Sequence, residues 1–334
     1  MNLMTRTDQA PIIHRKKTRK AIKMLKFLFK LSFSFLLIMI VLTEIDINKF
    51  VKQITSANPI YLSLAVISVI FGQAVGSMRM RYYGESLQIY FSRLYSLAFY
   101  FIGTLFNIVL PGGIGGDGYK AYYFQKKFRY PWHKSVFVVL RGRASGLLIL
   151  CLFLGILGVL YSDLIQVKYA KEFFLAGLVL LFPVYSIMVK KLLKETVEVQ
   201  VGAIKYSVLV QIFYLFAIIF ILYSLGTFNN IMGYIIVFLI SNIVAVIPIS
   251  FGGLGLREFT FIKMSVVMHL QTDIGVAASM LFYLAYTVTS LIGVFPYIFI
   301  DRLDKREFEY LRKIGKMKDK DKSEENSSTE QDIG

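Results

Sequence analysis

The chain has 334 residues, of which 56% are hydrophobic and 18% are charged, and its mean hydropathy is +0.60. A soluble domain does not need so many apolar residues, so the composition excludes a soluble globular protein and indicates an integral membrane protein. The net charge is +17, but the basic residues gather at the ends of apolar runs, which favours an anionic membrane surface as partner and argues against nucleic acid.

The N-terminal region is strongly basic over residues 1–26, and an apolar segment follows at 27–43. The charged stretch is long for a signal peptide, and no small-residue cleavage site follows the apolar segment. We therefore expect a cytoplasmic tail over 1–26 and an uncleaved first transmembrane helix.

Seven further apolar segments predict helices that are long enough to enter or cross a bilayer. They are 59–78, 94–110, 144–162, 172–189, 206–225, 231–249 and 274–300. Residues 301–334 are highly charged, so we expect a disordered cytoplasmic tail there. The predicted organisation is one all-α polytopic membrane domain over 27–300, between two polar tails.

A glycine-rich signature follows two of these segments, 94–110 and 231–249. One copy runs from Pro111 to Lys120 and the other from Pro248 to Arg257, and both read Pro-x-x-x-Gly-Gly-x-Gly-x-Lys/Arg. Proline and glycine at this density cannot continue a helix. Each copy therefore places broken backbone and a cation beside an apolar segment. The alternative interpretation is close helix packing, for which membrane helices often use small residues.

The distribution of lysine and arginine predicts how the chain crosses the membrane. If all eight segments crossed, the basic stretches 111–143 and 190–205 would lie outside, against the positive-inside rule. Both stretches become cytoplasmic if the segment 94–110 enters the membrane from the cytoplasm and returns to the same side. The basic segment 302–322 is also cytoplasmic if the segment 231–249 enters from the outside and returns there. We therefore predict six full spans and two re-entrant elements in an inverted repeat, a design of secondary transporters. The alternative is eight full spans.

We expect the two signatures to bind an anionic lipid group. Glycine lets backbone N–H groups converge on an anion, and a helix N-terminus adds its positive end. Lys120 and Arg257 would contact a phosphate. Asp117 and Glu258 would balance charge or carry protons, and Asn107 offers a neutral hydrogen-bonding group. The other predicted site residues are prolines and glycines of the signatures: Pro111, Gly112, Gly113, Gly115, Gly116, Pro248, Gly252, Gly253 and Gly255.

Several arginines lie near segment ends, where a positive-inside flank explains them without a ligand. We interpret Arg79, Arg81, Arg93 and Arg141 in this way. Arg143 leads directly into Ser-Gly and an apolar helix, so for this residue two roles stay open, a topological flank and a contact to the phosphate in the same cavity.

Catalytic patterns are missing from the sequence. The run from Gly113 to Gly118 satisfies G-x-G-x-x-G, but no βαβ unit surrounds it, and Tyr119 breaks the P-loop spacing before Lys120. One cysteine and three scattered histidines make no metal cluster, and no Ser/His/Asp set or carboxylate pair is visible. We therefore expect no enzyme activity, no cofactor and no metal.

Three motifs carry a family resemblance: Asn107-Ile-Val-Leu-Pro-Gly-Gly-Ile-Gly-Gly-Asp117, Arg143-Ala-Ser-Gly146 and Ile247-Pro-Ile-Ser-Phe-Gly-Gly-Leu-Gly-Leu-Arg-Glu258. Together they resemble the transmembrane region of lysylphosphatidylglycerol synthases, a flippase-like family, over about 25–300. The resemblance implies a bacterial or archaeal membrane domain linked to moving aminoacylated phosphatidylglycerol between leaflets.

Two departures from the family pattern affect what the resemblance implies. The sequence ends after the membrane region, so we expect no soluble synthase domain and no lipid aminoacylation by this chain. Gly142 stands where the family often has an acidic residue, which weakens the ion-pair role implied for Arg143.

These observations predict a lipid translocase of the cell membrane with both termini in the cytoplasm. Its cargo would be an anionic or aminoacylated phospholipid, or a polyprenyl-phosphate lipid. The alternative is a non-catalytic scaffold or accessory subunit of a lipid-modifying or envelope glycan-synthesising enzyme. The expected partners are accordingly membrane lipids, with a lipid-modifying enzyme, a glycosyltransferase or a second copy of the chain as further partners that stay open.

Overall fold

The computed structural model describes residues 47–109, 115–165, 168–247 and 255–313, and every regular element within these ranges is helical. Five apolar stretches within these described ranges are long enough to cross a membrane. They are α3 (Pro59–Ser86), α6 (Trp132–Leu160), α7 (Ala170–Leu193), α8 (Val197–Ser224) and the run Thr272–Ile298, which contains α11 (Thr272–Ser290), η2 (Leu291–Gly293) and α12 (Val294–Ile298). The predicted all-α polytopic fold is confirmed. The predicted first span, 27–43, lies outside the described residues.

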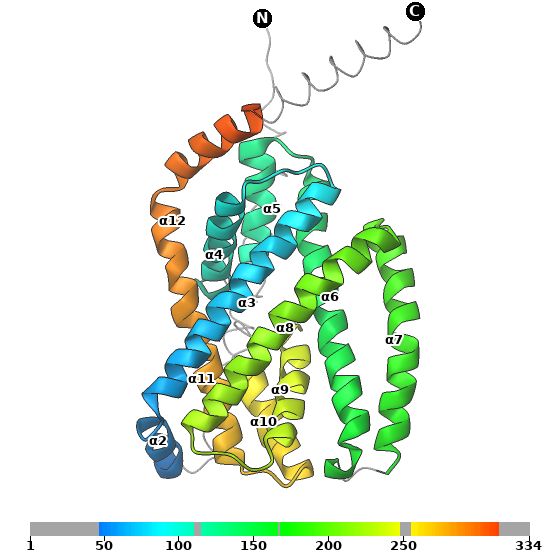
Figure 1. Ribbon diagram of the computed structural model, residues 1–334, viewed down its shortest axis with the longest axis vertical. Helices are drawn as coiled ribbons and strands as arrows, with labels where there is room; N and C mark the ends of the chain where they lie inside the picture. The colour runs from blue at the N-terminus through cyan, green and yellow to red at the C-terminus, as the bar shows by residue number, and fades with distance from the viewer. Residues whose placement is uncertain (1–46, 110–114, 166–167, 248–254, 314–334) are drawn as a thin grey trace, which may run out of the picture.

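Four shorter helices form two hairpins, each about half the height of the bundle (Figure 1). The first pairs α4 (Arg93–Val109) with α5 (Gly115–Phe128), and the second pairs α9 (Ile231–Ala245) with α10 (Leu256–Val267). The hairpins enter from opposite ends, and α6, α7 and α8 connect them. At 1.5 Å per residue, the 17 residues of α4 reach only about 25 Å. This is the geometry expected for oppositely oriented re-entrant elements, whereas their depth in a bilayer stays a prediction.

Two spans begin earlier than their apolar residues suggested, because polar residues shortly after their starts, such as Ser135 and Gln200, are buried in the protein. We expected spans at 144–162 and 206–225, but α6 begins at Trp132 and α8 at Val197. Arg141 in the early part of α6 is buried and donates hydrogen bonds to the carbonyl oxygens of Leu193 (2.8 Å) and Lys194 (3.0 Å) at the end of α7. The arginine thereby satisfies carbonyls that a helix end leaves open.

A buried carboxyl group lies beside Arg141 in the connection between α7 and α8. The Nε atom of Arg141 is 3.8 Å from Glu195 Oε2, and burial raises the pKa of the Glu195 carboxyl to about 7 although Arg141 lowers it. Arg141 therefore stabilises the α6–α7–α8 junction, which is more than the topological role that we expected.

The core surrounds α9, in which six consecutive residues from Tyr234 to Leu239 are buried. A helix that is apolar and buried on all sides lies inside protein instead of facing lipid. By contrast, α7 leaves apolar side chains such as Phe173 and Val179 largely exposed, as expected for a lipid-facing helix. The second hairpin therefore sits inside the bundle, and α7 lies at its edge.

The hairpin of α4 and α5 is held by close backbone contact at two glycines. A Cβ atom added to Gly116 would lie 1.7 Å from the carbonyl oxygen of Gly103. A Cβ atom on Gly103 would lie 1.9 Å from Cε of Lys120. The two helices can therefore cross here only because both residues lack a side chain, which also leaves room for Lys120. Packing thus explains Gly116 without any ligand.

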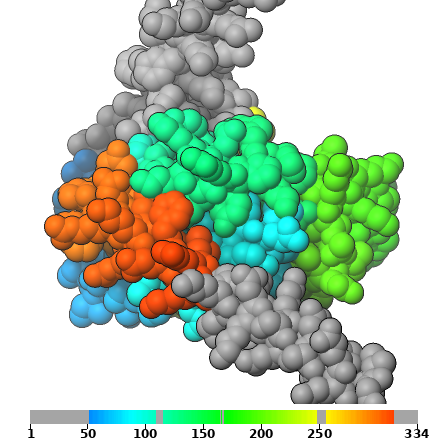
Figure 2. Space-filling model, turned by 90° about the horizontal axis from the view of Figure 1, so that it is seen from above, coloured from blue at the N-terminus to red at the C-terminus, as the bar shows by residue number. Residues whose placement is uncertain are grey.

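A further helix continues over residues 300–313 and lies across the end of the bundle beside α5 (Figure 2). Its carboxylates Asp304 and Glu307 are buried. Asp304 accepts hydrogen bonds from the hydroxyls of Tyr95 (3.1 Å) and Tyr123 (2.6 Å), and Glu307 accepts from the backbone N–H of Ser92 (2.7 Å). The expectation of a disordered tail from residue 301 is therefore wrong as far as residue 313, because buried acidic residues attach this charged segment to the bundle.

The glycine contact predicts unequal effects of alanine at two positions of the first turn of α5. Gly116→Ala forces a methyl group into backbone and should lower stability by about 2 kcal/mol or more. Gly118→Ala meets nothing within 4 Å and should stabilise the helix by about 1 kcal/mol. Thermal unfolding of the purified protein in detergent measures both. Equal midpoints for the two variants would contradict the described packing.

The topology predicts that Lys126, at the end of α5, and Lys194, after α7, face the same side of the membrane, opposite Asn229. We would place a single cysteine at each position in a Cys151→Ala background. An impermeant maleimide added to intact cells should label position 229, and should label positions 126 and 194 only after lysis. Labelling of 126 in intact cells would exclude a re-entrant first hairpin with a cytoplasmic N-terminus.

Candidate functional site

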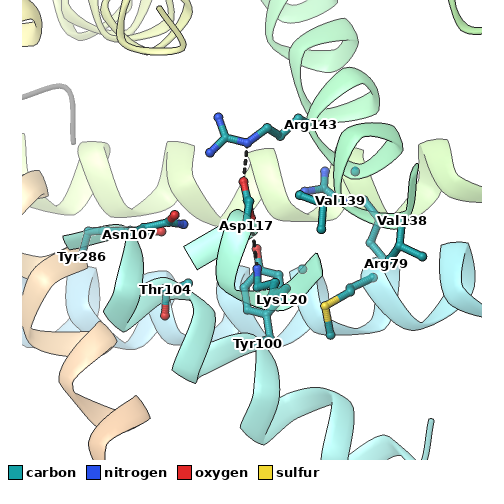
Figure 3. A pocket seen from close by; sticks show the side chains of 13 residues that line it. Arg79, Tyr100, Thr104, Asn107, Asp117, Lys120, Val138, Val139, Arg143 and Tyr286 are labelled. Carbon is teal, nitrogen blue, oxygen red and sulfur yellow. Dashed lines mark hydrogen bonds and ion pairs between the residues drawn. The ribbon is translucent and has the colours of Figure 1, made fainter. Parts of the chain in front are cut away.

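Two adjoining cavities lie where the hairpins meet. One, of about 160 Å³, is bounded by α3, α4, α5, α6 and α11 (Figure 3). The other, of about 260 Å³, is bounded by α4, α6, α8, α9, α10 and α11. We call them the Lys120 cavity and the Arg257 cavity. Asn107, Arg143 and Tyr286 line both, so the two form one continuous candidate site.

In the Lys120 cavity, one carboxylate lies between two cations (Figure 3). Lys120 Nζ is 3.4 Å from Oδ1 of Asp117, and Nε of Arg143 contacts Oδ2. Lys120 is 5% exposed, and its ammonium also lies 4.5 Å from the ring centroid of Tyr100. Asp117 stands in the first turn of α5, where the helix dipole favours a negative charge. It therefore holds Lys120 and Arg143 in fixed positions at the cavity.

The position of Arg143 excludes a purely topological flank, whereas the predicted contact to a phosphate stays a prediction. Its side chain lines both cavities and is bonded to Asp117, so it is more than a topological flank. The family's acidic partner is replaced by Gly142 in the sequence, and here the carboxylate comes from α5 instead. The ion pair thus joins the first signature to α6.

Arg79 is a cavity residue that the sequence analysis assigned to topology. It lies on α3, lines the Lys120 cavity and donates a hydrogen bond to Ser207 Oγ at 3.1 Å. Its guanidinium lies over two glycines of α6. A Cβ atom on Gly146 would be 3.3 Å from Nη1 of Arg79, and a Cβ atom on Gly142 would be 4.0 Å from its Nε. Glycines four residues apart on a helix were the sequence signal that a side chain from another helix crosses there.

Asn107 connects the broken ends of the first hairpin. Its Oδ1 accepts a hydrogen bond from the backbone N–H of Gly116 at 2.9 Å, which satisfies an open donor at the start of α5. The same side chain lines both cavities. Asn107 therefore lies in the candidate site, as predicted, and its Oδ1 already accepts a structural hydrogen bond from Gly116.

In the Arg257 cavity, Arg257 has no carboxylate beside it among the described residues that line the cavity. Its guanidinium carbon lies 5.8 Å from the ring centroid of Phe282, and the buried Nε makes no hydrogen bond within the described part of the chain. A buried donor without a partner costs free energy, and an acceptor on a ligand would recover it. The remaining polar lining comes from a second cation, Arg143, and from amides and phenols: Asn107, Gln211, Asn242, Tyr214, Tyr283 and Tyr286.

Glu258 makes structural hydrogen bonds at the start of α10, and its predicted role in balancing charge or carrying protons stays a prediction. Its Oε2 accepts from the backbone N–H of Gly255 at 2.7 Å and its Oε1 from Ser279 Oγ at 2.8 Å, and the side chain lines neither cavity. It thereby caps the start of α10, where Gly255 has a φ of +83° that favours glycine. We therefore assign Glu258 and Gly255 to the helix start that positions Arg257.

The remaining predicted glycines and prolines differ in what the structure says of them. Gly115 and Gly116 begin α5, and neither lines a cavity. The others lie outside the described residues: Pro111, Gly112, Gly113, Pro248, Gly252 and Gly253.

The clamp around Asp117 predicts a cost when its charge is removed. Asp117→Asn removes the carboxylate that the buried Lys120 and the partly exposed Arg143 share, and should lower stability by about 2 kcal/mol. Adding Lys120→Met should recover part of this loss, because the two effects are coupled. Glu85→Gln removes the partner of Arg81 in a pair whose carboxylate is 39% exposed, so it should change stability by less than about 1 kcal/mol. Thermal unfolding in detergent measures all three. Additive losses in the double variant would contradict the clamp.

The sequence was also compared with known proteins. The family described as the lysylphosphatidylglycerol synthase TM region matches residues 27–196, which include Asp117, Lys120 and Arg143, whereas the second signature lies beyond the match. No curated protein matches the chain. The matched range is half of the chain, and the five membrane-spanning stretches agree with it. The chain therefore belongs to the family of the lysylphosphatidylglycerol synthase TM region and is a multi-pass membrane protein of lipid or cell-envelope metabolism.

Proposed function

We propose that this protein moves a phosphate-containing lipid between the leaflets of the cell membrane. The cargo is an anionic or aminoacylated phospholipid or a polyprenyl-phosphate lipid. The observation that carries the proposal is the pair of joined cavities between two oppositely oriented hairpins, lined by Arg79, Lys120 and Arg143 on one side and Arg257 on the other. Ionisable residues at membrane depth are costly, and their convergence on a cavity favours a ligand.

The chemistry of the cations supports phosphate as the recognised group. Arginine offers a planar fork that can donate two parallel hydrogen bonds to phosphate, and lysine acts as a point charge. Asp117 holds one of each beside the Lys120 cavity, so they need little rearrangement to meet an anion. The unpartnered Nε of Arg257 supplies a further donor in the adjoining cavity.

The arrangement of the hairpins suggests how the headgroup would move. The described ends of both hairpins line the joined cavities, at Asn107 and Asp117 in the first hairpin and at Val246 and Arg257 in the second. Rocking of one hairpin and its neighbours against the other would open the site first to one side and then to the other. In this mechanism the acyl chains stay in the bilayer, and the protein transports the lipid without catalysing a reaction.

We further propose that both termini lie in the cytoplasm. Lys127 of α5 is 3.0 Å from Asp304 Oδ2, so the helix at 300–313 lies at the same end of the bundle as the basic end of α5. That end also carries the lysines of the α7–α8 connection. The positive-inside rule assigns such an end to the cytoplasm.

Lipid translocation in proteoliposomes tests the proposal. Lys120→Met and Arg257→Gln should each slow the movement of a fluorescent anionic phospholipid at least tenfold, because each removes a charge-assisted contact. The matched controls are Lys126→Met on α5 and Lys263→Met on α10, which are exposed and line neither cavity. Dithionite quenching of the outer leaflet follows the rate.

Each outcome of that experiment has a distinct meaning. If the wild-type protein moves no lipid but still binds it, the translocase proposal fails and an accessory role beside a lipid-modifying or glycan-synthesising enzyme is favoured. If movement occurs and all four variants equal wild type, transport does not use this site.

A further inference from the structure

We propose that the site selects a phosphate carrying an uncharged, hydroxyl-rich headgroup and rejects a cationic headgroup. This inference rests on the proposed function and narrows its substrate class. It excludes the aminoacylated lipids that the proposed function still allows, and it is carried by the charges and the neutral polar groups of the two cavities.

The balance of charge in the site is strongly positive. Its lining contains four cations, Arg79, Lys120, Arg143 and Arg257, and one carboxylate, Asp117. Glu258 does not line the site but is next to Arg257 in the chain. If it is counted as a second carboxylate, the four cations still give the site a net charge of +2. The adjacent stretches 110–114 and 248–254 add no ionisable residue by sequence. A site of this charge attracts a phosphate and repels a second cation.

An ammonium group would find no acidic partner in the described site. Both oxygens of Asp117 are engaged, one by Lys120 and one by Arg143. Both oxygens of Glu258 accept hydrogen bonds from within the protein, and the side chain lines neither cavity. An aminoacyl group such as lysyl would therefore bring its amines into a positive cavity without a carboxylate to pair with, a like-charge contact that lowers affinity.

The Arg257 cavity instead offers neutral hydrogen-bonding groups. Gln211 and Asn242 present amides, and Tyr283 presents a phenol. Asn242 Nδ2 already donates to the Phe238 carbonyl oxygen at 2.9 Å, which leaves its own oxygen as an acceptor. Hydroxyl groups both donate and accept, so they suit amides and phenols together, whereas an ammonium can only donate. The unpartnered Nε of Arg257 requires an acceptor as well.

Aromatic rings in the same cavity raise a competing possibility, because ring faces also attract ammonium groups. Here the ring of Phe282 already faces the guanidinium of Arg257, at 5.8 Å from its centroid. A ligand ammonium at that ring would lie beside the arginine. Zwitterionic lipids are therefore the comparison most able to overturn the proposal.

The shared chemistry is a phosphate ester of a polyol, which occurs both in phospholipids and in sugar-carrying polyprenyl phosphates. The full-length protein in detergent would be offered mixtures of chain-matched lipids: phosphatidylglycerol, its lysyl ester, phosphatidylethanolamine and phosphatidic acid. A separate mixture would pair phosphatidylglycerol with a polyprenyl-phosphate hexose. Native mass spectrometry counts the bound lipid of each kind, and the second mixture distinguishes the two sources.

We expect phosphatidylglycerol or the polyprenyl-phosphate hexose to bind at least tenfold more tightly than the lysyl ester and phosphatidylethanolamine. Gln211→Met and Asn242→Leu should reduce the preference for phosphatidylglycerol over phosphatidic acid at least fivefold. The two variants remove amides that can bond to the glycerol hydroxyls of phosphatidylglycerol, whereas the headgroup of phosphatidic acid has no such hydroxyls. Asn229→Leu, in the exposed connection after α8, is the matched control and should leave the ratio unchanged.

Two failures are distinguishable. If the lysyl ester or phosphatidylethanolamine binds as well as phosphatidylglycerol, or if the amide variants leave the ratio unchanged, the headgroup inference is overturned and phosphate recognition survives. If no phosphate lipid, phosphatidic acid included, binds above the level of a Lys120→Met/Arg257→Gln double variant, the proposed function itself is overturned.

Discussion

The carboxylate of Asp117 joins α5 to α6 at the centre of the protein, and the candidate site depends on this contact. It pairs with Lys120 on its own helix and with Arg143 on the next. Without it, two cations would face each other in a space with little water, at a cost that packing would have to offset. With it, both are held in place at a cavity and their net charge remains positive. One residue thus joins two helices and holds two cations at the candidate site.

The same contact requires an interrupted helix. Asp117 can stand at mid-height only because α4 ends and α5 begins there, with Asn107 bonded to the N–H of Gly116 and with Gly103 and Gly116 in backbone contact. The second hairpin solves the equivalent problem differently, since Glu258 caps its own helix start and leaves Arg257 without a carboxylate at the cavity. The two copies of the signature are therefore unequal, because only the first places a carboxylate beside its cation at a cavity.

The glycines of the signature have structural roles that differ from the anion-binding role that their pattern suggested. A glycine-rich run beside a cation suggested a backbone nest for an anion. Position 116 instead requires glycine because a Cβ atom there would lie 1.7 Å from a backbone carbonyl oxygen. Position 255 favours glycine because its φ is positive. Conversely, Arg79 reads as a loop flank in the sequence, yet it reaches the cavity across Gly142 and Gly146 of another helix. The sequence around Arg79 gives no sign of this contact, and its signal lies on the other helix, in the spacing of the two glycines of α6.

Hydropathy and charge alone determined the membrane class and the helical architecture, and favoured opposed broken hairpins over eight full spans, because a bilayer imposes helix length and loop charge on the sequence directly. The two signatures likewise singled out Lys120, Asp117 and Arg257 as charges beside broken backbone. Only the tertiary structure decided which charges meet. It paired Asp117 with Arg143, left Arg257 among amides and phenols, and attached residues 300–313 through buried Asp304 and Glu307. Such pairings depend on helix crossings between distant segments, whose distances and directions are not encoded in local periodicity.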